Sequence, residues 1–263
     1  MLSQRTLSAC VLLPVVAVLV WLGGYPLAIA LAVAAVLATK EVLDLSRRLG
    51  ATPSYALALP MAVALVADGV FPQWGVLSWC MLLLPLGLLA IEVGHQNRPG
   101  SLLSWAVAVA APLYVGYALG YWARLRTTEQ GIWWLAIALV GTWIADSGAY
   151  FVGVKWGKRK LATAISPKKT WEGVAGELAG ALLSVTPFAL LVLHVPWWAA
   201  VAMAVALAAA AVIGDLAESV IKRQAGVKDS SNLIPGHGGM LDRVDSLLFV
   251  VPVIYIARML LAG

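Results

Sequence analysis

Charged residues are scarce in this chain of 263 residues. Only 12% of the residues are charged, 62% are hydrophobic, and the mean hydropathy is +0.89. Soluble globular domains carry about 25% charged residues, so this composition excludes that class. Disorder is excluded as well, because so much apolar surface, including 12 Trp, has to be buried. The composition therefore predicts a membrane protein.

Cysteine is also rare, and Cys10 and Cys80 both lie in apolar stretches far apart in the sequence. This separation gives no metal-ligand spacing and no reason to predict a disulfide. The net charge of +5 raises the question of nucleic acid, but the basic residues occupy short loops without a nucleic-acid motif. We therefore expect no nucleic-acid partner.

A sustained alternation of apolar and polar residues is missing, which argues against a membrane β-barrel. The apolar stretches are instead long and rich in Ala, Leu and Val, and a bilayer core needs about 20 such residues per helix. The predicted fold class is an all-α polytopic integral membrane protein with about nine transmembrane helices. The predicted spans are residues 8–23, 25–39, 56–71, 75–91, 105–122, 132–151, 173–193, 197–217 and 246–262.

The first two spans are short, because Gly23, Gly24 and Pro26 interrupt the opening apolar stretch. Eight spans is therefore the alternative count. A signal peptide cleaved after Ala30 is a second alternative, although the first helix of a polytopic protein also directs insertion when it is retained. We expect a retained first helix.

Lys and Arg predict the orientation of the spans, since these residues accumulate in cytoplasmic loops. With a cytoplasmic N-terminus, all basic residues except Arg124, Arg126 and Arg258 fall on the cytosolic side. Most of the acidic residues follow residue 140. We therefore divide the chain into a scaffold of helices (1–130) and a catalytic region (131–263), with a polar site at the cytosolic side of the C-terminal helices.

The most polar segment runs from Asp215 to Asp245. Asp215, Glu218, Ser219 and Lys222 have the spacing i, i+3, i+4 and i+7, so they line one face if the eighth span continues as a helix. Ionisable groups at this depth are costly unless they pair or bind something, which makes them functional candidates. The alternative for Glu218 is an ion pair with Lys222.

Asp215, Asp242 and Asp245 are candidate metal ligands, and Asp146 in the sixth span is a further candidate. Converging carboxylates repel one another unless a cation lies between them. Oxygen ligands suit Mg²⁺, which binds through a few carboxylates, waters and a substrate phosphate. The alternative is a set of internal ion pairs, such as Asp242 with Arg243.

The glycine-rich loop Pro235–Gly239 lies between Asp215 and Asp242. Its glycines permit a backbone that turns N–H groups toward an anion, which predicts a phosphate cradle, although such a loop is often only a turn. His237 is expected to donate to a phosphate or to cap the loop. Basic residues around the loop strengthen the phosphate interpretation: Lys222, Arg223, Lys228 and Arg243.

A second polar segment, Ser166–Gly173, precedes the seventh span. Pro167 ends any helix that arrives from the loop, and Thr170 is in position to begin the next one. Lys168 and Lys169 at such a helix start can contact phosphate oxygens as point charges. An ordinary positively charged loop is the alternative.

The run from Ser219 to Asp245 contains Ser-x-x-Lys-Arg, Lys-Asp, Pro-x-His-Gly-Gly and Asp-Arg-x-Asp. It resembles the signature of the phosphatidate cytidylyltransferases, or CDP-diacylglycerol synthases. Residues 146–157 and 166–173 are similar to two further stretches of that family. The resemblance covers the C-terminal half of the chain and implies transfer of a cytidylyl group from CTP to phosphatidic acid, with Mg²⁺ required, in phospholipid biosynthesis.

The resemblance also implies a site and a setting. A lipid phosphate is already an anion, so positioning, metal and charge neutralisation are expected to carry the catalysis. We expect one Mg²⁺, with a second metal ion left open, a homodimer, and a bacterial inner membrane. The expected catalytic residues are Asp215, Lys222, Asp242 and Asp245, and the expected substrate-binding residues are Lys168, Lys169, Ser219, Arg223, Lys228, His237, Gly238, Gly239 and Arg243.

Two other functions fit the residues. One is a CTP-using membrane enzyme that acts on another lipid, such as a polyprenol kinase or an ether-lipid cytidylyltransferase. The other is a transporter of phosphate-bearing anions, in which the charged groups would form a pathway. Transporters often show two related halves, whereas the polar residues here crowd into one half of the chain.

Overall fold

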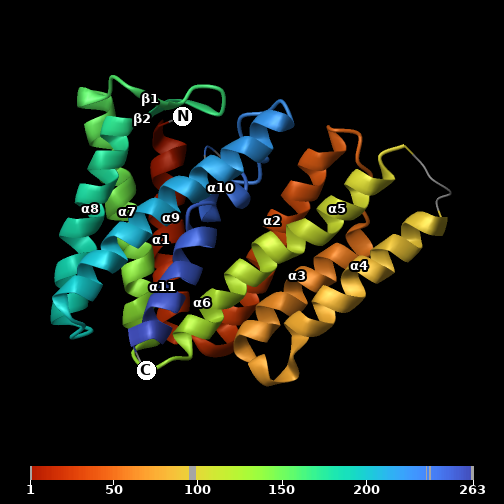
Figure 1. The fold of residues 1–263 in the computed structure, drawn as a ribbon, viewed down its shortest axis with the longest axis horizontal. Coiled ribbons are helices and arrows are strands. Elements are labelled where there is room, and N and C mark those ends of the chain that lie inside the picture. Colours follow the sequence, from red (N-terminus) through yellow and green to blue (C-terminus); the bar gives the residue numbers. More distant parts are fainter. Residues whose placement is uncertain (1, 95–98, 235, 237, 262–263) are drawn as a thin grey trace. The chain divides into compact units, whose positions relative to one another are not determined.

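In the residues that it describes, the computed structural model of the chain is mainly helical and contains one β-hairpin (Figure 1). It describes residues 2–94, 99–234, 236 and 238–261. Within these ranges, seven helices are long and apolar enough to cross a bilayer, and the chain is accordingly a polytopic helical membrane protein. The seven segments are Gly24–Arg47, Val76–Gly94, Ser101–Arg126, Gly131–Trp156, Trp171–Leu191, Trp197–Gln224 and Leu241–Leu261.

Each of the nine predicted spans overlaps a helical segment of the structure. Two of these segments are not among the seven: the 16-residue helix Tyr55–Val70, and Leu2–Leu22, whose described apolar part is Leu12–Leu22. The position of the apolar helices is therefore confirmed, while the count of nine stays a prediction, as does the alternative count of eight.

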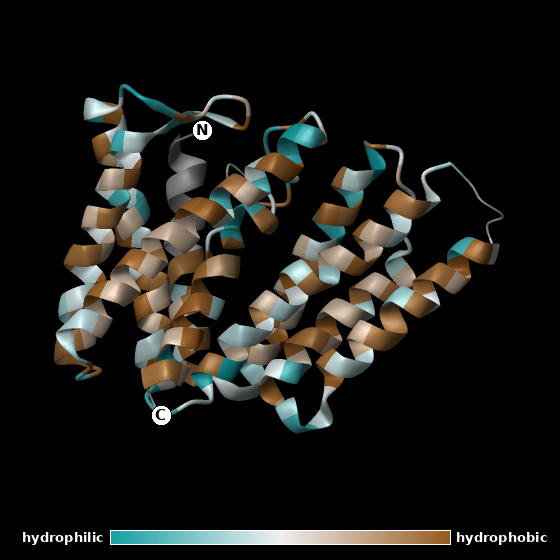
Figure 2. Cartoon of the chain, in the orientation of Figure 1, coloured by the Kyte–Doolittle hydropathy of each residue, from teal (hydrophilic) through white to brown (hydrophobic). Residues whose placement is uncertain are grey.

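Two helices extend well beyond the apolar stretches that predicted them. The span predicted at 25–39 belongs to a helix that reaches Arg47, and the span predicted at 197–217 belongs to one that reaches Gln224. Hydropathy marks only the apolar part of a helix, whereas Lys, Arg, Glu and Gln continue it because they are good helix formers. Figure 2 shows these hydrophilic ends in teal.

Two compact units divide the chain. Unit 1 comprises Met1–Thr127 and Ile221–Val244, and unit 2 comprises Thr128–Val220 and Asp245–Gly263. The segment Ile221–Val244, which carries much of the polar motif, thus belongs with the N-terminal helices. The predicted division into a scaffold and a catalytic region concerns function and stays a prediction.

Unit 1 is a bundle around α3, which contacts α2, α4, α5 and the segment that follows α5. Its core holds fully buried leucines such as Leu43, Leu65 and Leu119. The helical elements of unit 1 are α1 (Leu2–Leu22), α2 (Gly24–Arg47), α3 (Tyr55–Val70), the 3₁₀ turn η1 (Pro72–Trp74), α4 (Val76–Gly94), α5 (Ser101–Pro112), the π-helical turn η2 (Leu113–Tyr117), α6 (Ala118–Arg126) and α10 (Leu241–Val244), and it also holds the last turn of α9.

Unit 2 contains α7 (Gly131–Trp156), α8 (Trp171–Leu191), α11 (Leu247–Leu261) and most of α9 (Trp197–Gln224). Helix α7 packs against both α8 and α11. Where α7 crosses α8, a Cβ atom on Gly176 would lie 2.5 Å from the carbonyl oxygen of Gly148. Small residues let the two backbones approach closely, which is how helices associate in a bilayer.

A β-hairpin joins α7 to α8, formed by β1 (Lys160–Ala162) and β2 (Ser166–Thr170). The strands are antiparallel, with Lys160 opposite Thr170. The all-α prediction misses this hairpin, because strands of three and five residues are too short to show a period.

The start of α8 confirms the prediction made from Thr170. The Thr170 Oγ1 atom accepts a hydrogen bond from the N–H of Gly173 at 3.1 Å, as an N-cap does. The carboxylate of Glu172 accepts the N–H groups of Lys158 and Arg159. The base of the hairpin is therefore tied to the first turn of α8.

Candidate functional site

Four carboxylates and a lysine gather in unit 2, and each acts electrostatically on others of the group. The charges that act on Asp146 are those of Asp245, Asp215 and Lys169, and those that act on Glu177 are Asp146, Lys169 and Asp215. They come from α7, α8, α9, β2 and the turn before α11. We call these five residues the acidic cluster.

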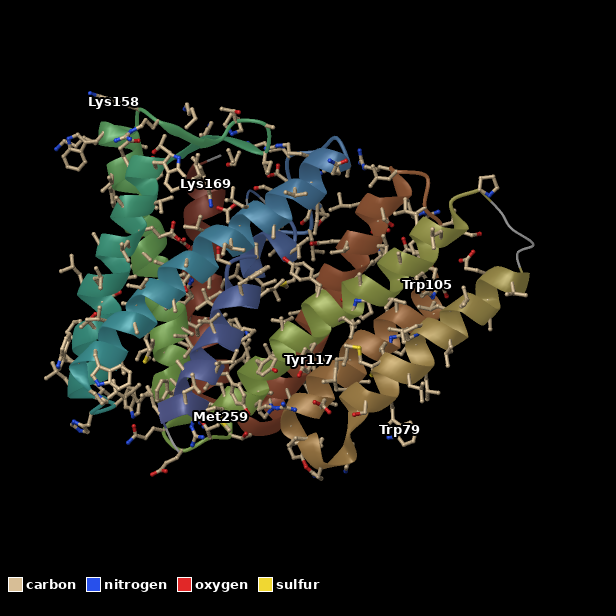
Figure 3. All side chains as sticks on the ribbon, viewed as in Figure 1. Trp79, Trp105, Tyr117, Lys158, Lys169 and Met259 are labelled. Atoms are coloured by element: carbon tan, nitrogen blue, oxygen red, sulfur yellow. The ribbon has the colours of Figure 1, made fainter. Side chains whose placement is uncertain are left out.

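Lys169 provides the ion pair of the acidic cluster. Its Nζ atom lies 2.8 Å from Oδ2 of Asp215. The other oxygen of Asp215 accepts a hydrogen bond from the Ser219 hydroxyl at 3.3 Å. Figure 3 marks Lys169, which the hairpin brings to the end of α7 and α8 that also carries Lys158. Two predicted phosphate ligands, Lys169 and Ser219, thus both contact one predicted metal ligand.

Accessibility varies across the acidic cluster. Glu177 is buried, with 4% of its surface exposed, whereas Asp146 is exposed and Asp215 is partly exposed. A ligand can therefore reach Asp146 and Asp215 from outside, whereas Glu177 lies among the helices. The sequence offers a signal for Glu177, since it lies one turn into its apolar span and can face the same polar interior as Asp146, although it is not among the predicted site residues.

The acidic cluster has the chemistry of a cation site, because four carboxylates outnumber its single lysine. In the described part of the chain, no three His, Cys, Asp or Glu side chains are close enough to form a complete metal site by themselves. Mg²⁺ does not need one, since it commonly binds one or two carboxylates together with waters and substrate phosphates. The donor set therefore fits a cation that also binds substrate oxygens.

Helix α9 runs without interruption to Gln224, which confirms that the eighth predicted span continues as a helix. Asp215, Glu218, Ser219 and Lys222 consequently follow one side of it. Glu218 and Ser219 are buried, and so is Lys222, whose exposed fraction is 9%.

In unit 1, Asp242 organises the loop that follows α9. Its Oδ1 atom lies 2.6 Å from Nζ of Lys222, and its Oδ2 atom accepts the Ser230 N–H, the Ser230 hydroxyl and the Gly239 N–H at 2.7–2.8 Å. Asp242 therefore forms an internal ion pair, as the alternative predicted, but its partner is Lys222 and not Arg243. Asp242 is thus a structural centre of this loop, and its role as a metal ligand stays a prediction.

A second carboxylate, Glu41 of α2, holds the same loop. It accepts hydrogen bonds from the hydroxyls of Ser230 and Ser231 and from the N–H groups of Met240 and Leu241. Sequence reasoning missed Glu41. The signal in the sequence is weak, because Glu41 follows Lys40 just beyond the predicted span at 25–39 and resembles an ordinary polar helix end.

The glycine-rich loop is shaped by these two carboxylates. A Cβ atom on Gly239 would collide with Ser230 Oγ and with the Glu41 carboxylate, and Gly238 has a φ of 77°. The N–H groups of Gly239, Met240 and Leu241 donate to carboxylates of the protein itself. Pro235 and His237 lie outside the described residues, so phosphate binding by Gly238, Gly239 and His237 stays a prediction.

The structure therefore groups the predicted site residues into two sets, one in each unit. Unit 2 brings Asp146, Lys169, Asp215 and Asp245 together, with Ser219 on Asp215; unit 1 brings Lys222 and Asp242 together. Helix α10 ends at Val244, so Asp242 and Asp245 do not share one regular helix. The remaining basic candidates have exposed side chains: Lys168, Arg223, Lys228 and Arg243.

Comparison with known proteins gives consistent matches over both units. The cytidylyltransferase family profile matches residues 3–261. A protein of Bacillus subtilis named phosphatidate cytidylyltransferase is 40% identical over 191 residues, which cover 72% of this chain and 69% of the relative. Proteins of the same name from Staphylococcus aureus (strain COL) and Synechocystis sp. are 33% and 31% identical, over 97% and 96% of this chain and 98% and 95% of the relatives. The chain belongs to the cytidylyltransferase family.

Proposed function

We propose that this protein transfers the cytidylyl group of CTP to phosphatidic acid, giving CDP-diacylglycerol and pyrophosphate in phospholipid biosynthesis. Relatives named phosphatidate cytidylyltransferase match the chain over nearly its whole length. The structural observation that carries the proposal is the acidic cluster with Lys169, held by apolar helices. It combines cation-binding oxygens with a phosphate-binding cation in a membrane protein, where a lipid substrate is found.

The reaction needs little proton transfer. The phosphate of phosphatidic acid is an anion at neutral pH, so one of its oxygens attacks the α-phosphorus of CTP directly. A bond forms between this oxygen and the α-phosphorus while the bond from the α-phosphorus to pyrophosphate breaks on the opposite side. The protein contributes the alignment of the two substrates and the neutralisation of their charges.

One or two of the carboxylates of Asp146, Asp215 and Asp245 would hold Mg²⁺ together with substrate oxygens, and Asp242 is the remaining predicted ligand. When bound, Mg²⁺ would neutralise charge on the α-phosphate of CTP and on the departing pyrophosphate. The basic side chains then orient the triphosphate and the lipid phosphate: Lys168, Lys169, Lys222, Arg223, Lys228, His237 and Arg243.

The proposed setting is a bacterial inner membrane with the site facing the cytosol, and the proposed assembly is a homodimer. Bacterial relatives and the accumulation of Lys and Arg in one set of loops support the setting. CTP is then drawn from the cytosol, and phosphatidic acid reaches the site by lateral diffusion in the bilayer. The homodimer rests on the family resemblance.

The test uses purified protein in mixed micelles with labelled CTP, phosphatidic acid and Mg²⁺. We expect label in the chloroform-extractable lipid only when all three are present, and a loss of at least about 100-fold in Asp215→Asn. The matched control is Glu129→Gln, which changes an exposed acid of the loop before α7 and leaves activity unchanged.

Two further arms separate the alternatives. Transfer of γ-phosphate label to a polyprenol, or of α-phosphate label to an ether lipid, without α-phosphate label in phosphatidic acid, would assign the enzyme to another acceptor. Labelled anions that cross proteoliposomes chemically unchanged, without any labelled lipid, would identify a transporter.

A further inference from the structure

Glu41 is a buried carboxylate that lies far in sequence from every motif of the family resemblance. It is 5% exposed and sits in the C-terminal part of α2, just beyond the apolar stretch of that helix. A charge in such a place persists only when it is fully hydrogen-bonded. The hydrogen-bond donors around Glu41 therefore indicate its role.

The Glu41 carboxylate accepts four hydrogen bonds, and all four donors belong to residues between Ser230 and Leu241. The Oε1 atom accepts the Ser231 hydroxyl at 2.7 Å and the Met240 N–H at 2.9 Å. The Oε2 atom accepts the Leu241 N–H at 2.8 Å and the Ser230 hydroxyl at 2.9 Å. Glu41 thus binds two residues that precede the glycine-rich loop, Ser230 and Ser231, and two that follow it, Met240 and Leu241.

The Ser230 hydroxyl links Glu41 to the predicted catalytic pair. It lies 2.9 Å from Oε2 of Glu41 and 2.7 Å from Oδ2 of Asp242. A hydroxyl carries one hydrogen, so the two carboxylates share it. Asp242 in turn pairs with Lys222. A shift of Glu41 is therefore transmitted to Asp242 and Lys222 through a single side chain.

We propose that Glu41 is a positioning residue of the cytidylyl transfer. By holding Ser230, Ser231, Met240 and Leu241 against α2, it sets the positions of Asp242 and Lys222. In this role it acts through Asp242 and Lys222 and not on the substrate directly. The expected effect on kcat rests on the proposed function, whereas the expected effect on amide hydrogen exchange does not.

A control variant is needed that also removes a buried acid of unit 1 but lies far from the Glu41 contacts. Asp68 provides it. Asp68 is 3% exposed and pairs with Arg124 at 2.7 Å. Rings of Tyr25 and Phe71 lie 6.4 Å apart, which places the Asp68 end of α3 beside the start of α2. Glu41 lies 16 residues beyond Tyr25, which is about 24 Å along the helix. Asp68→Asn is therefore a matched control at a distance.

The experiment compares Glu41→Gln with Asp68→Asn. Hydrogen exchange of the amides of Gly239, Met240 and Leu241 is expected to become about 10-fold faster in Glu41→Gln, since Gln offers one acceptor oxygen where Glu offers two. Asp68→Asn leaves these amides unchanged. At a temperature at which both variants are folded, we expect kcat to fall about 100-fold in Glu41→Gln with a smaller change in KM, and neither to change in Asp68→Asn.

Two outcomes overturn the proposal: unchanged exchange of these amides in Glu41→Gln, or faster exchange with unchanged kcat. Wild-type protein without cytidylyl transfer refutes the proposed function instead, and the exchange result then shows only that Glu41 fixes the loop. If Glu41→Gln does not fold, Ser231→Ala removes one of the four hydrogen bonds and keeps the charge. It is expected to lower kcat to a smaller extent, and an unchanged kcat in Ser231→Ala would contradict the proposal.

Discussion

Lys222 and Asp242 form a buried ion pair in unit 1, with side chains 11% and 8% exposed. Removing one partner leaves a buried charge without its counter-ion, which costs about 3–5 kcal/mol, whereas removing both costs less. We expect Lys222→Met and Asp242→Asn each to lower the free energy of unfolding strongly. The double variant is expected to lose less than the sum of the two, as measured by unfolding in detergent.

Additive losses in that double-mutant cycle would show that the pair is not energetically coupled. Turnover is a separate readout. Both residues are predicted to be catalytic, so the double variant is expected to recover stability and not activity.

Lys169 competes with any cation for Asp215, since its Nζ atom lies 2.8 Å from that carboxylate. The pair is partly exposed and is accordingly worth about 1 kcal/mol or less. We expect Lys169→Met to tighten binding of Mn²⁺, a spectroscopic substitute for Mg²⁺, by up to about 5-fold in an electron paramagnetic resonance titration. Lys168→Met, which removes the exposed neighbouring lysine of the same strand, is the control. Equal shifts in both variants would indicate only a change in net charge.

At the scale of the elements, the N-cap of α8 decides how the hairpin meets the helix. Thr170 Oγ1 accepts the Gly173 N–H, and Thr170 is the partner of Lys160 in the hairpin. Thr170→Ala is expected to lower the free energy of unfolding by about 1 kcal/mol, and Thr170→Ser by less, because serine keeps the capping oxygen. Thermal unfolding of the two variants side by side makes the comparison. An equal loss in both would assign the effect to the Thr170 methyl group and not to the cap.

The glycine-rich loop shows how an element can be recognised in a sequence while its inner contacts are not. Its glycines and flanking charges predict a loop that binds phosphate. In the structure, the last N–H group of the loop, that of Gly239, donates to Asp242, and the next two, of Met240 and Leu241, donate to Glu41. A run of glycines specifies that the backbone can turn tightly. It does not specify which acceptor the N–H groups will meet, because that acceptor comes from a distant helix.

For the whole molecule, the number of spans decides on which side of the membrane the N-terminus lies. With nine spans, six precede the hairpin, so the N-terminus and the hairpin lie on the same side; with eight spans they lie on opposite sides. We expect the same side, because the hairpin and the N-terminal segment both carry basic residues. Epitope tags at the N-terminus and in the hairpin, probed in sealed inverted vesicles, make the measurement. Protection of one tag while the other reacts would support eight spans.

The sequence by itself determined the fold class, the place of the helices and the family of this protein. Those properties rest on signals that are local in the chain: an apolar run for each helix, a capping residue at Thr170, and a motif of charged residues and glycines within residues 219–245. Only the tertiary structure decided that Glu41 accepts hydrogen bonds from residues such as Met240, and that Lys169, Asp146 and Asp215 belong to one acidic cluster. Hydrogen bonds and ion pairs act over a few ångströms in space, and residues that are 190 positions apart in the chain, as Ser231 is from Glu41, reveal such a contact only after the helices have packed.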